Sequence, residues 1–111
     1  MTQPPFGYSS EFDVADLGSL TSAGVTAAQE VRGESMSFQV TVADVGTNVV
    51  VRFEGSLDGV GYFNLSSTGD YTITANGVTG YFLRAPVRFV RFRLVSLSGG
   101  TPTASCKIGT I

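Results

Sequence analysis

The chain of 111 residues contains no histidine and no tryptophan, and its single cysteine is Cys106. Without histidine, the commonest general base and the commonest metal-ligating side chain are both missing. A single cysteine cannot form a disulfide within the chain, which fits a protein made in a reducing compartment. These absences argue against an enzyme, and the sequence predicts no cofactor and no bound metal.

Long apolar runs are missing as well. No stretch is long enough to cross a bilayer as a helix. The first residues lack the basic region and apolar run that together mark a signal peptide. We therefore expect no membrane segment, and synthesis in the cytoplasm of a host cell.

Charge is scarce and unevenly placed. Charged residues make up 14% of the chain and the formal net charge is −2, which argues against general nucleic-acid binding. All nine acidic residues precede Arg84, whereas five of the seven basic residues lie from Arg84 onward. Such asymmetry can steer one copy onto another, or the chain onto a charged partner.

The clearest pattern that is present lies between residues 49 and 63. Val49, Val51 and Phe53 share one face of an extended chain, because side chains alternate with a period of two. Arg52 and Glu54 take the opposite face. Asp58–Gly59 follows as a hairpin signal, since glycine adopts positive φ without steric cost. The stretch predicts a strand, a tight turn and a second strand.

The same alternation recurs along the chain. Inward-facing residues are predicted at Met36, Phe38, Val40 and Val42, at Tyr71 and Ile73, at Val90, Phe92 and Leu94, and at Ala104, Cys106 and Ile108. Further short strands are predicted over Phe12–Leu17 and Tyr81–Arg84, with turns at Asp44–Asn48, Ser66–Asp70, Asn76–Gly77 and Gly99–Pro102. Seven or eight short strands, separated by turns about every 8–12 residues, predict an all-β fold of the antiparallel β-sandwich kind.

The sequence is long enough for one domain, within which two parts are expected. Residues 1–34 are predicted to form an extended arm, a first strand and a connection, and residues 35–111 the β-sandwich core. The connection, Gly18–Gly33, is predicted to cross one end of the domain, and Val25–Val31 has room for a single helical turn.

The first ten residues allow two interpretations. Pro4 and Pro5 favour an extended conformation, and the aromatic residues Phe6 and Tyr8 follow closely. The segment is either a frayed terminus or an arm whose aromatic side chains dock on a neighbour.

Few residues are candidates for chemistry. The neighbours of Cys106 alternate as in a strand, which predicts a buried, inert thiol. Glu54 and Asp58 lie roughly 13 Å apart along a straight strand, beyond the separation of about 5–9.5 Å between the two carboxylates of glycosidases. Asp58 is better explained as a residue that caps its own turn. A calcium site would need about six oxygen ligands, and the sequence offers one or two.

Four arginines fall within ten residues: Arg84, Arg88, Arg91 and Arg93. Arg91 and Arg93 share one face of the predicted strand. They either pair with Glu54 on a neighbouring strand or present a basic surface to an acidic partner. Single-stranded nucleic acid is a weaker interpretation, because the strand lacks the exposed aromatic ladder of such binders.

Two motifs carry a resemblance that covers roughly Ser35–Ile108. Ser56–Phe63, with its S-L-D-G turn, resembles the S-x-D-G hairpin of discoidin-like, galactose-binding-like modules, and Pro86–Phe92 resembles their aromatic–V–R strand. The S-L-D-G hairpin and the G-G-T-P turn at Gly99–Pro102 also resemble small β-sandwich proteins of tailed-phage particles. Both resemblances imply a jelly-roll-like sandwich.

The resemblance also implies two functions. The first is a structural virion protein on the capsid surface, of the decoration or cement type. It would bind the major capsid protein or other virion subunits, as a homo-oligomer (dimer or trimer), through Pro4, Pro5, Phe6, Tyr8, Arg84, Arg88, Arg91 and Arg93. The alternative is a carbohydrate-binding or adhesion module of a tail fibre or surface protein. An exposed cluster of Tyr8, Tyr71 and Tyr81 at a concave site would favour sugar, and flat apolar patches would favour assembly.

Overall fold

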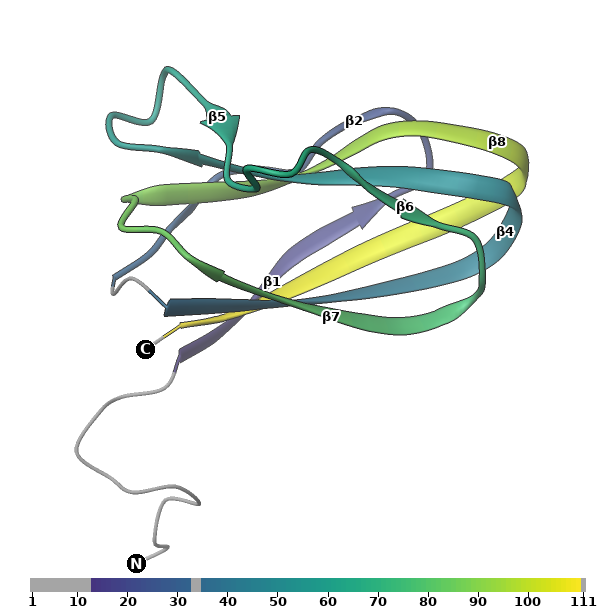
Figure 1. Cartoon of the computed structure of the whole chain (residues 1–111), viewed down its shortest axis with the longest axis horizontal. Helices are drawn as coiled ribbons and strands as arrows, with labels where there is room; N and C mark the ends of the chain where they lie inside the picture. Colours follow the sequence, from purple (N-terminus) through teal and green to yellow (C-terminus); the bar gives the residue numbers. More distant parts are fainter. Residues whose placement is uncertain (1–12, 33–34, 111) are drawn as a thin grey trace, which may run out of the picture.

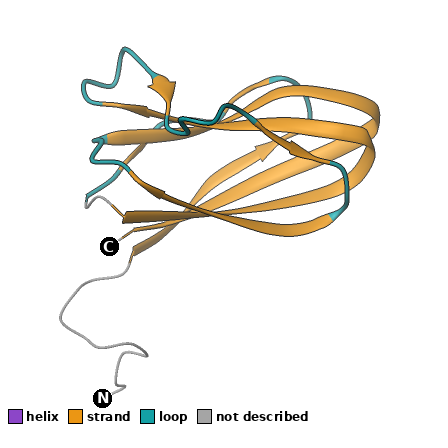
Figure 2. Ribbon diagram, viewed as in Figure 1, coloured by secondary structure: helices purple, strands orange, loops and turns teal. Residues whose placement is uncertain are grey.

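Two long strands, β4 (Ser35–Ser56) and β8 (Phe89–Thr110), form the centre of the fold and pair antiparallel along their length (Figure 1). The structure is a computed structural model, and it describes residues 13–32 and 35–110. The remaining strands are β1 (Asp13–Leu20), β2 (Gly24–Val25), β3 (Gln29–Glu30), β5 (Phe63–Asn64), β6 (Tyr71–Ile73) and β7 (Gly77–Arg84). Figure 2 shows strands and loops throughout the described residues.

Both long strands bend sharply in the middle, at the right of the view in Figure 1. The register of the ladder between them shifts on each side of Val45, and Val45 itself pairs with Gly100. Gly99 and Gly100 have φ of +73° and +62°, a region that favours glycine. A Cβ atom on Gly46 would lie 2.2 Å from the carbonyl carbon of Gly99. The bend therefore requires backbone to touch backbone.

The bend refines two of the expected turns. The chain turns back at Asp44–Asn48 and Gly99–Pro102 as predicted, but both segments lie inside continuous strands and do not interrupt them (Figure 1). The same residue types suit a bulge as well as a turn, because both need unusual backbone angles. The two strands bend together and stay paired, so each passes from one layer to the other and runs back in the opposite direction (Figure 1).

The single eight-stranded sheet thereby folds over itself into two layers. One layer has the order β1, the second half of β8, the first half of β4, and β7. The other has β2 with β3, the first half of β8, the second half of β4, and β5 with β6. This wrapped order is that of a jelly roll. The predicted all-β, antiparallel, jelly-roll-like sandwich is confirmed, although β4 and β8 are 22 residues each rather than short.

The core lies between the two layers and follows the predicted alternation. Every residue that the alternation of β4 and β8 placed inward is buried: Met36, Phe38, Val40, Val42, Val49, Val51, Phe53, Val90, Phe92, Leu94, Ala104, Cys106 and Ile108. Phe38 and Phe53 belong to opposite halves of β4, and their rings stack with centroids 4.2 Å apart. The bend is thus what brings one half of a strand against the other.

The connection before β4 differs from its prediction. It contains β2 and β3, which pair with β8 along its edge, and Val25–Val31 contains no helical turn. Between the two short strands, the Thr26 amide donates to the Phe92 carbonyl, and the Thr26 hydroxyl accepts from the Phe92 amide. The open backbone groups of β8 offer this segment more hydrogen bonds than an isolated helical turn would make.

Three smaller predictions also need adjustment. The hairpin after β4 exists, with Gly55 opposite Phe63, but residues 57–62 form a longer loop than a two-residue turn. The strand predicted at Tyr81 begins earlier, at Gly77, whose φ is +125°. The first strand is β1, and Phe12 lies outside the described residues.

Replacing Phe53 with alanine tests the core. The Phe53 ring is fully buried and contacts the rings of Phe38, Tyr71, Tyr81 and Phe92. We expect Phe53→Ala to lower the free energy of unfolding by about 3–5 kcal/mol, measured by urea denaturation. A matched Val60→Ala change, at a side chain that is 85% exposed, should alter it by less than about 0.5 kcal/mol. Equal effects of the two changes would contradict the packing described.

Replacing Gly46 with alanine tests the bend. The added methyl group would overlap the backbone of Gly99, so one of the two long strands has to move. We expect Gly46→Ala to cost about 2–3 kcal/mol of unfolding free energy, measured in the same way. Gly61→Ala is the control, because a Cβ there meets nothing within 4 Å. A Gly46→Ala protein as stable as the Gly61→Ala protein would show that β4 and β8 do not touch at the bend.

Candidate functional site

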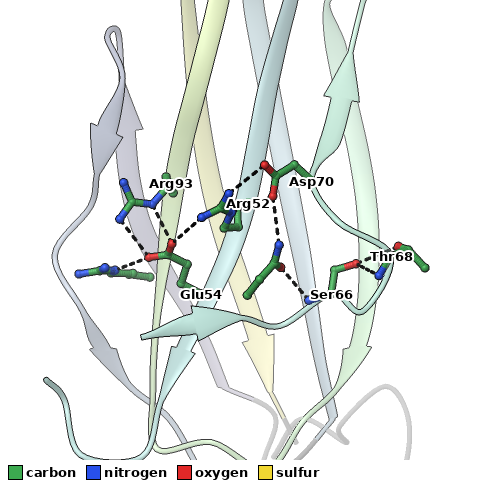
Figure 3. A network of polar contacts seen from close by, with 8 residues as sticks. Arg52, Glu54, Ser66, Thr68, Asp70 and Arg93 are labelled. Atoms are coloured by element: carbon green, nitrogen blue, oxygen red, sulfur yellow. Dashed lines mark hydrogen bonds and ion pairs between the residues drawn. The ribbon is translucent and has the colours of Figure 1, made fainter. Parts of the chain in front are cut away.

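A cluster of charged side chains covers the outer face of the second layer (Figure 3). Arg52 and Glu54 alternate with the buried residues of β4, and Arg91 and Arg93 do the same on β8. The ladder places Arg52 opposite Arg93 and Glu54 opposite Arg91. Because directly opposed residues share a face, the two strands bring all four side chains together.

Glu54 is the centre of this network. Its carboxylate accepts hydrogen bonds from Nε of Arg91 and Nε of Arg93, each at 2.7 Å, and lies 3.4 Å from Nη1 of Arg52. The Glu54 side chain is only 6% exposed. Burial raises its pKa, but the hydrogen bonds from Arg93 and Arg91 outweigh burial, and the pKa lies below its ordinary value. Glu54 is therefore ionised and committed to the arginines.

The network continues into the connection between β5 and β6. Arg52 donates to both carboxylate oxygens of Asp70, at 2.7 and 3.0 Å, and this hydrogen bonding lowers the pKa of Asp70. The Asn64 side chain donates to Asp70 and accepts from the Ser66 amide. The Ser66 hydroxyl in turn accepts from the Thr68 amide, as Figure 3 shows. These contacts hold a loop that has little regular structure of its own.

Arg91 also joins the network to the loop at residues 57–62. Its guanidinium lies over the Tyr62 ring, 3.8 Å from the centroid, which is a close cation–π contact. Within the loop, the Asp58 carboxylate accepts from the amides of Val60 and Gly61, and these bonds lower its pKa. Gly59 has φ of +80°. The prediction that Asp58 caps its own turn is confirmed.

The structure separates the four predicted arginines into three places. Arg91 and Arg93 meet at Glu54, which is the pairing that the sequence offered as one of two interpretations. Arg88 pairs with Glu30 on the neighbouring β3, at 3.2 Å and exposed to solvent. Arg84 is the last residue of β7, in the other layer, and it also takes part in an interaction there. Pro4, Pro5, Phe6 and Tyr8 lie outside the described residues.

The remaining candidates for chemistry have structural roles. Cys106 is fully buried, and burial raises the pKa of its thiol to about 12. Among the described residues, no group of three or more acidic or cysteine side chains is arranged to hold a metal ion. The Tyr71 and Tyr81 rings contact each other in a tilted arrangement, with centroids 4.3 Å apart, and both contact Phe53 in the core. They do not form an exposed aromatic platform.

Sequence reasoning missed the most exposed apolar side chains. Phe82 and Val78 on β7 are 81% and 65% exposed, and Leu57, Val60 and Phe63 are exposed at the β4–β5 hairpin. A signal for Phe82 was present, because it alternates with Tyr81 and Leu83, which face the core. Only the position of β7 at the edge of its layer shows that nothing within the sheet covers Phe82.

No helix among the described residues is long and apolar enough to cross a membrane.

No family model matches this chain, and no curated protein does. Among solved structures, the SPBc2 prophage-derived protein YomS aligns over 94% of this chain and 99% of its own, with a TM-score of 0.60 and 14% identity. A protein of the Bacillus endospore appendages, which form disulfide-linked pili, aligns over 89% of this chain and 82% of its own, with 12% identity and a TM-score of 0.48. PirA aligns over 95% and 97%, with 10% identity and a TM-score of 0.48. At these identities the likeness to YomS is one of fold, and the other two carry no further argument.

Replacing Glu54 with glutamine tests the network through its pH dependence. The pKa of Glu54 is lower in the folded chain than its unfolded value of about 4.3, so ionised Glu54 stabilises the fold above that pH. We expect Glu54→Gln to cost about 1–3 kcal/mol at pH 7, because three arginines lose their shared anion. The gap should close as pH falls through the folded pKa, since wild-type Glu54 then becomes neutral as well.

The measurement is urea denaturation of both proteins between pH 2.5 and 7. Glu30→Gln is the matched control, because the Glu30–Arg88 pair is exposed and should contribute at most about 1 kcal/mol. A gap for Glu54→Gln that does not change with pH would mean that the charge of Glu54 is not what stabilises the fold.

Proposed function

We propose that this chain is a structural virion protein, specifically a capsid decoration (cement) protein that binds and stabilises the major capsid shell of a phage. The observation that carries the proposal is the exposure of large apolar side chains. Phe82 and Val78 project from β7, and Leu57, Val60 and Phe63 from the β4–β5 hairpin. Large apolar side chains left exposed on a folded domain often mark protein–protein contacts.

The use of the polar residues supports a role without catalysis. Glu54 is held by arginines, Asp58 bonds its own loop, and Cys106 is enclosed by the core. Side chains that serve catalysis need access to a substrate and a tuned proton affinity at the working pH. Here each candidate is either inaccessible or already engaged, so recognition by surface contact is the better-supported mode of action.

The comparison of folds supports a phage particle as the setting. A protein described as prophage-derived shares this fold across nearly the whole of both chains. The S-L-D-G hairpin and the G-G-T-P segment resemble virion β-sandwich proteins in the same region of the chain. In this proposal the protein is made in the host cytoplasm and ends on the capsid surface, bound to the major capsid protein or other virion subunits as a homo-oligomer.

A carbohydrate-binding module remains the alternative, and one observation weighs against it. Such modules present aromatic rings to the flat faces of sugars. Tyr71 and Tyr81 instead contact Phe53 between the two layers. The discoidin-like resemblance of the hairpin therefore has no matching aromatic platform on these two strands.

The proposal is tested by adding purified protein to capsids assembled without it and measuring occupancy by electron microscopy. Deleting residues 1–10 should weaken attachment at least about tenfold, because Phe6 and Tyr8 can each bury about 150–250 Å² on a neighbour. The melting temperature of the deleted protein should stay within about 2 °C of the full chain, since most surface changes cost under about 0.5 kcal/mol. Attachment should also loosen as salt rises if the arginines contribute.

Charge reversal of Arg91 and Arg93 is avoided, because it would remove two of the three arginines that contact Glu54 and place like charges beside it. Failure of the full chain to occupy such capsids would overturn the proposal. Selective binding to immobilised glycans, in place of capsids, would instead establish the carbohydrate alternative. A deleted protein that melts much lower but still fills the capsid would show that the arm belongs to its own domain.

A further inference from the structure

Among the described residues, no strand pairs with the outer edge of β7, and this edge lacks the features that normally keep sheet edges from pairing. Natural edges are kept short, bulged or charged. The edge strands of the second layer, β2, β3, β5 and β6, are only two or three residues long. β1 has a register shift between Asp16 and Gly18. By contrast β7 pairs with β4 over eight residues without a shift, and its single charged residue is the last one, Arg84.

The outward face of β7 is apolar where its neighbour is polar. Val78 and Phe82 lie on this face, two positions either side of Gly80. Their partners on β4 are Thr41 and Ser37, and Gln39 lies opposite Gly80. No apolar side chain on the adjoining strand can therefore cover Phe82, which explains its 81% exposure.

We infer that β7 is a dimerisation strand, which pairs antiparallel with β7 of a second copy about a two-fold axis at Gly80. In this register each Phe82 lies directly opposite the partner's Val78, and this pair occurs twice. Directly opposed residues in an antiparallel pair share a face, with Cβ atoms about 4.5–5.5 Å apart. The four apolar side chains then cover one another on the outer face of a sheet that runs through both copies.

The pattern itself indicates a second copy as the occupant. A two-fold contact requires a surface that is complementary to itself. Phe82 and Val78 are spaced equally about Gly80 and meet this requirement, because the two-fold rotation places Phe82 of each copy opposite Val78 of the other. A Cβ at Gly80 would meet nothing within 4 Å, so the space beside the axis is open for the diagonal Phe82 rings.

The expected dimer is weak in dilute solution. Two Phe82 rings bury about 300–500 Å² even when fully covered, which is less than half of a standard interface of about 1,600 Å². Such a contact becomes effective where copies are held close together on a shell. The inference thus rests on the proposed function for its biological setting, but the contact between copies is measurable with the purified chain alone.

Sedimentation velocity of the full chain over a range of concentrations tests the dimer. We expect Phe82→Lys to weaken dimerisation at least about tenfold, because it places a charge opposite the partner's Val78. Val60→Lys removes a side chain of similar exposure from the β4–β5 hairpin and should leave the dissociation constant unchanged. A monomer at all concentrations, or equal effects of the two variants, would overturn the inference.

Cysteine cross-linking tests the register. Gly80→Cys should give a disulfide-linked dimer on mild oxidation, because the axis places position 80 opposite itself within the usual Cα separation of a disulfide. Val78→Cys should not, since the two copies of position 78 lie about 13 Å apart along the strand. The native Cys106 is fully buried and does not compete. Equal cross-linking of both variants would show that this register is wrong.

The outcomes also separate this inference from the proposed function. A dimer that depends on Phe82, in a protein that does not occupy capsids, would support the β7 contact and overturn the capsid role. A dimer lost on deletion of residues 1–10 but insensitive to Phe82→Lys would place the N-terminal arm, and not β7, between the copies.

Discussion

Pairing of β4 with β8 on both sides of a sharp bend is the constraint on which the rest of this structure depends. Each strand contributes to both layers, so the two layers are one sheet folded over itself. The fold over requires close approach of backbone at Gly46 and Gly99, where any side chain would intrude. It also generates the core, because only the bend places Phe38 against Phe53 of the same strand. Residues without side chains thus determine where the largest side chains meet.

The charged side chains of the second layer bind one another, and this limits how far they can bind a partner. Three arginines share Glu54, and Arg52 extends the contact to Asp70 and so to the loop before β6. A buried carboxylate costs solvation free energy, and it is stable here because several donors reach it at once. The outer face of this layer is therefore a cross-linked polar surface. Most of the uncovered large apolar side chains lie elsewhere, on β7 and on the β4–β5 hairpin.

Alternation along strands was predictable from the sequence, because a period of two depends only on local geometry and on burial of one face. It placed Phe53, Phe92 and Cys106 inward correctly. The positions of the bends were predicted as turns, but the continuation of the strands through them was not predictable, since glycine, asparagine and aspartate favour turns and bulges for the same reason. Nor were β2 and β3, whose formation depends on the open edge of β8 rather than on their own residues. For the candidate site, Glu54 with Arg91 and Arg93 was one of two interpretations, and the exposure of Phe82 required knowledge of which strand lies at an edge.

The uneven protection of the edges links composition to the proposed assembly. With 14% charged residues, the chain has few charges with which to guard four sheet edges, and several of these are engaged around Glu54. Short strands protect the edges of the second layer, and a register shift interrupts β1. Among the described strands, the edge of β7 is therefore the one left without such protection. An open, apolar, eight-residue edge favours unwanted association in a protein that acts alone in solution. In a subunit whose edge is covered by another copy, the same edge supplies the directional backbone hydrogen bonds and the apolar contact that define how the copies join.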